Sequence, residues 1–197
     1  MSSKAGFDAR RLVLTALLTA IVVVLQMLGA FIRFGMFEIA LVLVPIVVGG
    51  ALYGALTGAW LGLVFGIVVL LNGDATVFLQ INAAATVVLV LLKGAAAGLA
   101  AGVVYRLFER RSQRLAVLLA AVVTPIVNSG IFALGCYAFY APVLSEWAGG
   151  PEKLTSYIFL TLIGLNFVFE FATDIILSNV ILRITKIGKR QFSAKNA

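Results

Sequence analysis

The sequence predicts an all-α integral membrane protein, with one domain over residues 1–197, six transmembrane helices and both termini in the cytoplasm. Of its 197 residues, 62% are hydrophobic and 12% are charged, whereas soluble domains carry about 25% charged residues. The hydrophobic residues form blocks of roughly the length that crosses a bilayer. The charged residues lie mostly between these blocks, as membrane topology requires. Such a chain has more apolar surface than a soluble fold of its size can bury.

The hydrophobic blocks define the expected helices, because a membrane-spanning helix needs about 20 consecutive apolar residues. The second and third blocks are short, so we expect those helices to be tilted or the bilayer to be thinned around them. The expected helices cover residues 11–28, 37–52, 55–71, 82–108, 115–139 and 156–185.

The basic residues predict the orientation of the chain. Most of the 15 lysines and arginines fall at the N-terminus, between the fourth and fifth helices, or at the C-terminus. This bias marks the cytoplasmic side and explains the net charge of +7 without nucleic acid as a partner. The outer connections hold only Arg33 and Lys153 as basic residues. The basic residues in the three groups are Lys4, Arg10, Arg11, Arg106, Arg110, Arg111, Arg114, Arg183, Lys186, Lys189, Arg190 and Lys195.

The sequence argues against metal, cofactor and catalytic chemistry. It contains no histidine, which is the commonest metal ligand and general base. Its single cysteine, Cys136, excludes an internal disulfide. It has no phosphate-binding loop of the type found in ATPases. We therefore expect no enzyme activity, no metal site and no cofactor in this chain.

Small residues recur at intervals of four in three of the expected helices. Such spacing lets membrane helices approach closely. For the stripes Gly58–Gly66 and Gly94–Gly102, we expect packing inside the protein. Ala16 and Ala20 in the first helix form a similar pair, which fits either internal packing or a docking surface for another membrane protein.

A polar stripe runs through the last expected helix. Asn166, Glu170 and Asp174 are four residues apart, so they lie one above the other on one helix face. A charged side chain at the bilayer centre costs about 2.5–3.5 kcal/mol. Two interpretations remain open: Glu170 or Asp174 pairs with Lys93 of the fourth helix, or part of the stripe lines a polar cavity.

The cavity interpretation extends to the fifth helix and the outer loops. Asn128 follows Pro125 near the middle of the fifth helix, and with Asn166 and Glu170 it could hydrogen-bond a ligand rich in amides, hydroxyls or ring nitrogens. Asp174 lies one turn closer to the cytoplasm, where we expect packing instead. The other candidate substrate-binding residues are Arg33, Asn82, Tyr137 and Trp147, of which Trp147 lies in a loop that could act as a lid.

Several stretches together resemble the substrate-binding S components of energy-coupling factor (ECF) transporters, over about residues 10–187. They are "ALLTA" in the first helix, "LVLVPIVVGGALYGALTGAWLGLVFG" across the second and third, "NAAATVVLVLLKGAAAGLAAGVVYRL" in the fourth, and "TPIVNSGIFALG" and "GLNFVFEF" in the last two.

The resemblance implies a multi-pass protein of the bacterial cytoplasmic membrane that binds a vitamin or related micronutrient near its outer face. The lid over the substrate is made by the first and fifth connecting loops. A separate module, consisting of a scaffold membrane subunit and two ATPase subunits, drives import. In the family, an Ala-x-x-x-Ala surface on the first helix meets the scaffold, and it maps here onto Ala16 and Ala20.

The substrate remains open among several vitamins. Asn128, Asn166 and Glu170 suit a riboflavin-, pantothenate- or folate-like ligand. The aromatic and acidic set expected for thiamine is not visible, and no metal motif suggests nickel or cobalt. One alternative is a self-sufficient proton- or ion-coupled transporter that uses Lys93, Glu170 and Asp174 as a relay. A membrane enzyme is disfavoured, and a purely structural membrane subunit would bind no small molecule.

Overall fold

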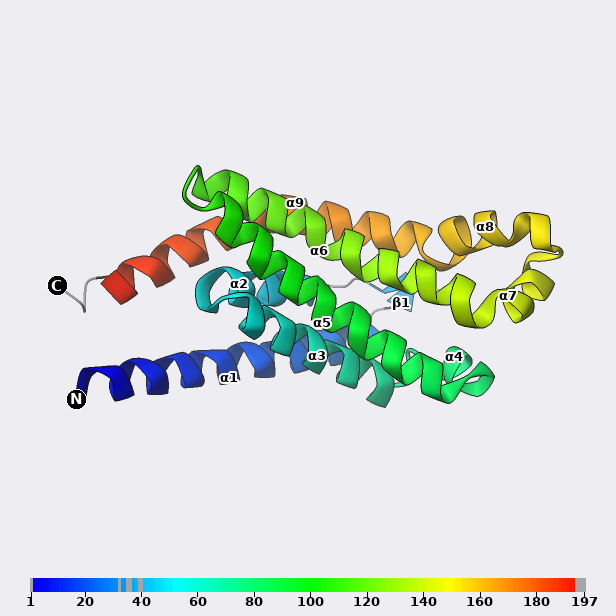
Figure 1. Cartoon of the computed structure of the whole chain (residues 1–197), viewed down its shortest axis with the longest axis horizontal. Coiled ribbons are helices and arrows are strands. Elements are labelled where there is room, and N and C mark those ends of the chain that lie inside the picture. Colours follow the sequence, from blue (N-terminus) through cyan, green and yellow to red (C-terminus); the bar gives the residue numbers. More distant parts are fainter. Residues whose placement is uncertain (1, 32, 35–36, 39–40, 194–197) are drawn as a thin grey trace.

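Figure 1 shows the helical bundle in a computed structural model, which describes residues 2–31, 33–34, 37–38 and 41–193. Apart from two strands of two residues each, every regular element in that part of the chain is helical. The prediction of a helical fold is confirmed. The elements are α1 (Ser2–Phe31), β1 (Arg33–Phe34), β2 (Phe37–Glu38), α2 (Leu43–Tyr53), α3 (Ala55–Leu71), α4 (Thr76–Ile81), α5 (Ala83–Phe108), α6 (Gln113–Gly135), the π-helix η1 (Cys136–Tyr140), α7 (Ala141–Ala148), the 3₁₀-helix η2 (Pro151–Lys153), α8 (Leu154–Ser156), the π-helix η3 (Tyr157–Leu162) and α9 (Gly164–Ser193).

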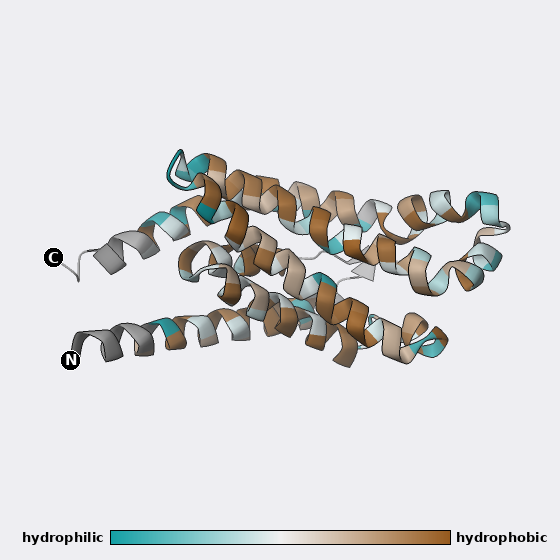
Figure 2. Cartoon of the chain, in the orientation of Figure 1, coloured by the Kyte–Doolittle hydropathy of each residue, from teal (hydrophilic) through white to brown (hydrophobic). Residues whose placement is uncertain are grey.

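Three helical stretches in the described residues are long and apolar enough to cross a membrane: Arg11–Gly29, Ala83–Phe108 and Gln113–Ala148. A fourth span results if the bent pair Pro151–Leu162 and Asn166–Gly188 counts as one. Helices α2 and α3 are apolar but shorter. Figure 2 shows hydrophobic residues along the middle of the bundle and hydrophilic residues gathered toward its two ends. The chain is therefore a multi-pass membrane protein.

The second helix differs from the predicted range of 37–52, because it begins at Leu43. Phe37 and Glu38 instead form β2, which pairs antiparallel with β1. The later start places Pro45 in the first turn, where the missing N–H of proline leaves no helical hydrogen bond unmade. A helix from residue 37 would place the same proline in its interior.

The last two predicted helices, 115–139 and 156–185, each include a π-helical segment. Segment η1 lies directly before α7, which has Pro142 in its first turn. A proline ring obstructs regular helical bonding in the preceding turn, and π-helical turns are a common way to accommodate such a disruption. Segment η3 ends at Leu162, and the chain bends by 41° before it continues as α9.

Helices α3 and α5 pack with their backbones in near contact. A Cβ added to Gly58 would meet the carbonyl oxygen of Gly98, and one added to Gly62 would meet that of Gly94. Only glycine allows this approach. The expectation that these stripes pack inside the protein is confirmed for the α3–α5 interface.

Two arginines hold the turn between α2 and α3. Arg11 of α1 donates a hydrogen bond to the carbonyl oxygen of Tyr53 at the end of α2. The Arg106 guanidinium lies against Gly54, whose φ of 97° makes the α2–α3 turn. Both arginines thus stabilise the negative C-terminal end of α2. The side chains of Lys4, Arg10, Lys189, Arg190 and Lys195 lie outside the described part of the structure.

We predict that Gly62→Ala lowers the free energy of unfolding by about 1–3 kcal/mol, because the new methyl group forces α3 away from α5. Thermal unfolding in detergent measures the effect. Gly130→Ala is the matched control, since a Cβ at Gly130 meets nothing within 4 Å. Equal unfolding temperatures for the two variants would contradict the close contact between α3 and α5.

Candidate functional site

A cavity of about 320 Å³ lies between the helices, at the end of the bundle opposite the chain termini. Its wall is built by α3, α4 and α5 on one side and by α6, η3 and α9 on the other. Gln26 of α1, Tyr140 of η1 and Trp147 of α7 also line the cavity. The volume is near the lower end of the range of about 300–1,000 Å³ for small-molecule sites.

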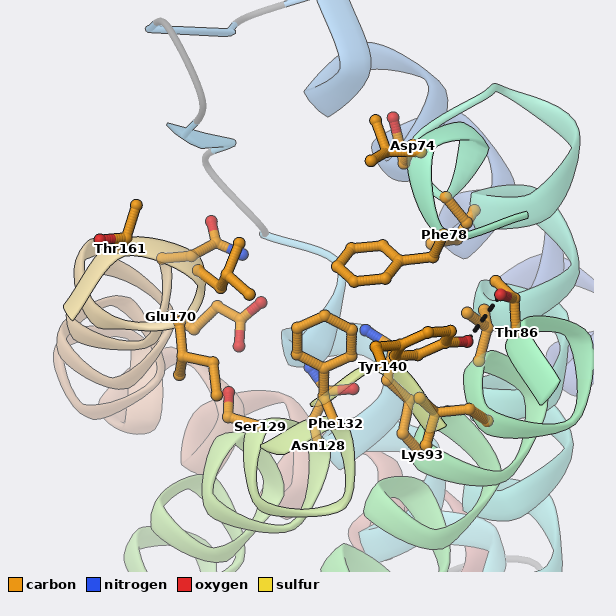
Figure 3. A pocket seen from close by; sticks show the side chains of 18 of the residues that line it. Asp74, Phe78, Thr86, Lys93, Asn128, Ser129, Phe132, Tyr140, Thr161 and Glu170 are labelled. Carbon is orange, nitrogen blue, oxygen red and sulfur yellow. Dashed lines mark hydrogen bonds between the residues drawn. The ribbon is translucent and has the colours of Figure 1, made fainter. Parts of the chain in front are cut away.

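Helices α6 and α9 provide a polar wall. Asn128 and Ser129 come from α6, and Asn166 and Glu170 from α9. Figure 3 shows Glu170 and Thr161 on one side of the cavity, with Asn128 and Ser129 on the helix beside them. Asn128 and Glu170 are each only 4% exposed. The Oδ1 atom of Asn128 has no hydrogen-bond partner among the described residues, and such a buried acceptor requires a donor to offset its desolvation.

An aromatic cluster from α4, α6 and η1 lies beside the polar wall. The ring of Phe78 lies 5.3 Å from that of Phe132, edge to face, and 5.1 Å from that of Tyr140. The Tyr140 hydroxyl is hydrogen-bonded to Thr86 Oγ1 at 2.6 Å (Figure 3). Aromatic pairs of this kind contribute about 0.5–1.5 kcal/mol beyond their buried area. The cluster gives a ligand an apolar surface with a fixed shape.

The cavity also contains a lysine. The Nζ atom of Lys93 lies 5.3 Å from the centre of the Phe132 ring and 5.7 Å from that of Phe65. Both distances fit cation–π contacts. The two rings thus flank the Lys93 ammonium group at the cavity wall.

A polar contact joins α1 to the connection between α3 and α4. The amide Nε2 of Gln26 donates to Asp74 Oδ2 at 2.9 Å. Both side chains line the cavity, and Gln26 is only 3% exposed. The contact therefore joins two parts of the cavity wall that are far apart in the sequence.

The structure brings together four of the candidate residues predicted from the sequence. Asn128, Asn166, Glu170 and Trp147 all line the cavity, and Trp147 is 45% exposed at its edge.

Two other candidates lie outside the cavity lining. Asn82 caps α5 by accepting a hydrogen bond from the backbone N–H of Ala85. Tyr137 donates a hydrogen bond to Thr155, and neither Asn82 nor Tyr137 lines the cavity. The side chain of Arg33 lies outside the described part of the structure.

Asp174 lies one helical turn beyond Glu170 on α9, outside the cavity lining. It is fully buried, it does not line the cavity, and neither of its carboxylate oxygens has a hydrogen-bond partner in the described part of the chain. The possible pairing of Lys93 with Asp174 is therefore wrong. The expectation that Asp174 packs below the cavity agrees with its position.

Several lining residues were not recognised in the sequence. Gln26, Phe65, Phe78 and Thr86 all contribute to the wall. Gln26 and Thr86 carry a weak signal, because each is one of only a few polar residues in an apolar helix. Phe65 and Phe78 carry none, since phenylalanine is common at every lipid-facing or packed position of such a chain.

The chain belongs to the family described as "ECF transporter, substrate-specific component", which matches residues 10–185. This family consists of substrate-binding transport proteins rather than enzymes, and its members take up vitamins and related micronutrients together with ECF partner subunits. The resemblance stated from the sequence is confirmed. No curated protein matches the chain.

We predict that Asp174→Asn raises the free energy of unfolding by about 1 kcal/mol or more, because it removes an ionisable group buried without a partner. Thermal unfolding in detergent measures this. Glu152→Gln, an exposed acid in the η2 segment, is the control and is expected to change nothing. A lower unfolding temperature for Asp174→Asn would show that the carboxyl group itself stabilises the fold.

Proposed function

We propose that this protein is the vitamin-binding subunit of an ATP-driven importer in the bacterial cytoplasmic membrane, with the cavity as its substrate site. The cavity carries the proposal, because it gathers Asn128, Asn166 and Glu170 in one buried space. Buried polar groups that converge on a small cavity define a ligand site better than any single residue does. Membership of the S-component family supports the transport role.

The proposed topology has six membrane spans. Helices α2 and α3 cross as short spans, and the bent segment from η2 to α9 crosses as one. The end with the chain termini then faces the cytoplasm, and the cavity opens toward the outside. Arg11 and Arg106 contact the α2–α3 turn. The α5–α6 connection, whose sequence carries Arg110 and Arg111, lies at the end of the bundle with the termini (Figure 1), which supports this orientation.

The proposed site residues have distinct roles. Asn128 and Glu170 accept hydrogen bonds from donors on the ligand, and Asn166 adds a third polar contact on the same wall. Trp147 covers the ligand from α7. The aromatic cluster of Phe78, Phe132 and Tyr140 binds its apolar part.

The proposed partners are a scaffold membrane subunit and two ATPase subunits. Ala16 and Ala20 are both exposed on α1, which supports a docking role rather than packing within the chain. Around them Val13, Leu17 and Val24 are also more than half exposed. Small side chains on such an apolar face would let a scaffold helix approach α1 closely.

The ion-coupled transporter has one observation in its favour, which is the buried carboxyl group of Asp174. A relay needs its groups in one connected path. Asp174 lies outside the cavity lining that contains Lys93 and Glu170, so the geometry favours the importer. Uptake by this chain alone that collapsed with the proton gradient would favour the ion-coupled transporter.

We predict that the double variant Asn128→Ala, Asn166→Ala loses any small molecule that co-purifies with the protein. Removing two buried polar contacts lowers affinity by at least about 30-fold. Native mass spectrometry after release from detergent measures the occupancy. Asn179→Ala is the matched control, because Asn179 is an exposed asparagine of α9 outside the cavity. Undiminished ligand in the double variant would place the binding site elsewhere.

We predict that Ala16→Trp and Ala20→Trp prevent assembly with the scaffold subunit and leave ligand binding intact, because a bulky ring blocks close helix contact. Co-purification of scaffold and ATPase subunits with the tagged chain measures assembly. Val88→Trp on α5, at a position that is 64% exposed, controls for the added ring. Assembly of all three variants at the wild-type level would exclude the Ala16–Ala20 face as the docking surface.

A further inference from the structure

The polar groups of the cavity would bind different chemical groups of a ligand. The α6–α9 wall offers acceptors, since Asn128 Oδ1 is buried without a hydrogen-bond partner among the described residues and Glu170 provides a carboxyl group. Helix α5 offers the ammonium group of Lys93. Figure 3 shows Glu170 and Lys93 entering from different sides of the cavity. A matching ligand carries hydrogen-bond donors in one part and a negative charge in another.

The surroundings of Lys93 strengthen its effect on an anion. Its ammonium group lies over Phe65 and Phe132, and Leu89 and Val90 line the cavity one turn earlier on α5. Water screens charges poorly in such apolar surroundings, so the attraction between an ammonium and a carboxylate is several times stronger there than in water. Aromatic rings also keep the long lysine side chain in place.

We propose that the substrate is a small organic acid that carries amide or hydroxyl donors, with its carboxylate at Lys93 and a donor at Asn128 Oδ1. This inference rests on the proposed function, because it takes the cavity as the substrate site. It also separates the three ligand types that the sequence left open. Riboflavin has no carboxylate, and folate carries two carboxylates on a much longer molecule. Pantothenate combines one carboxylate with an amide and hydroxyls in a small molecule.

Isothermal titration calorimetry with pantothenate and panthenol tests the inference. The two probes differ only in that panthenol has an alcohol where pantothenate has its carboxylate. We expect the wild-type protein to bind pantothenate at least about 10-fold more tightly than panthenol. Lys93→Met is expected to weaken pantothenate binding by about 30-fold or more and to leave panthenol binding within about 3-fold. Lys93→Arg keeps the positive charge, so this variant is expected to bind pantothenate more tightly than panthenol, as the wild type does. Lys153→Met, an exposed lysine outside the cavity, is the control.

Three outcomes would overturn the inference. Equal affinities for the two probes, or unchanged pantothenate binding by Lys93→Met, would show that no carboxylate is recognised at Lys93. Tight binding of riboflavin without binding of either probe would overturn the organic-acid assignment and leave the importer function standing. Absence of binding to any vitamin, together with no co-purifying ligand in native mass spectrometry, would overturn both proposals.

Discussion

The backbone contact between α3 and α5 is the constraint on which the rest of the structure depends. In a bilayer, apolar side chains gain little by leaving lipid for protein, so helices associate through close packing. Gly58 and Gly62 meet the carbonyl oxygens of Gly98 and Gly94, which leaves no room for a side chain between the helices. The contact continues at Gly66, which packs against the backbone of Val90 and Leu91. Phe65 and Val69 of the same helix, and Val90 of α5, line the cavity.

The two ends of the bundle are built differently, and the difference follows from their residues. At the end with the termini, Arg11 and Arg106 hold the α2–α3 turn, and the helices there are tied together. At the cavity end, the helical hairpin from η1 to η3 contains two π-helical segments and a 3₁₀ turn. Irregular helical turns of this kind are frequent at functional sites. An end held together by arginine contacts and an irregular cavity end suit a protein that binds a ligand from one side.

The sequence predicted the parts that depend on local periodicity. Helix α3 spans Ala55–Leu71, the range expected from hydropathy, and the glycine stripes pack as their spacing indicates. Asn166 and Glu170 reach the cavity because residues four apart share a helix face. The same rule could not show that Asp174 falls below the cavity, since the depth of a cavity is set by neighbouring helices. Nor could it show that Gln26 meets Asp74, because that contact joins α1 to a distant connection.

The central claim is that the cavity between α5, α6 and α9 holds the substrate. An experimental density map of the purified protein with its retained small molecule tests this claim most directly. The account predicts density for the ligand beneath Trp147, in contact with Asn128, Glu170 and Lys93. Ligand density at another surface, with side chains filling the cavity, would contradict it.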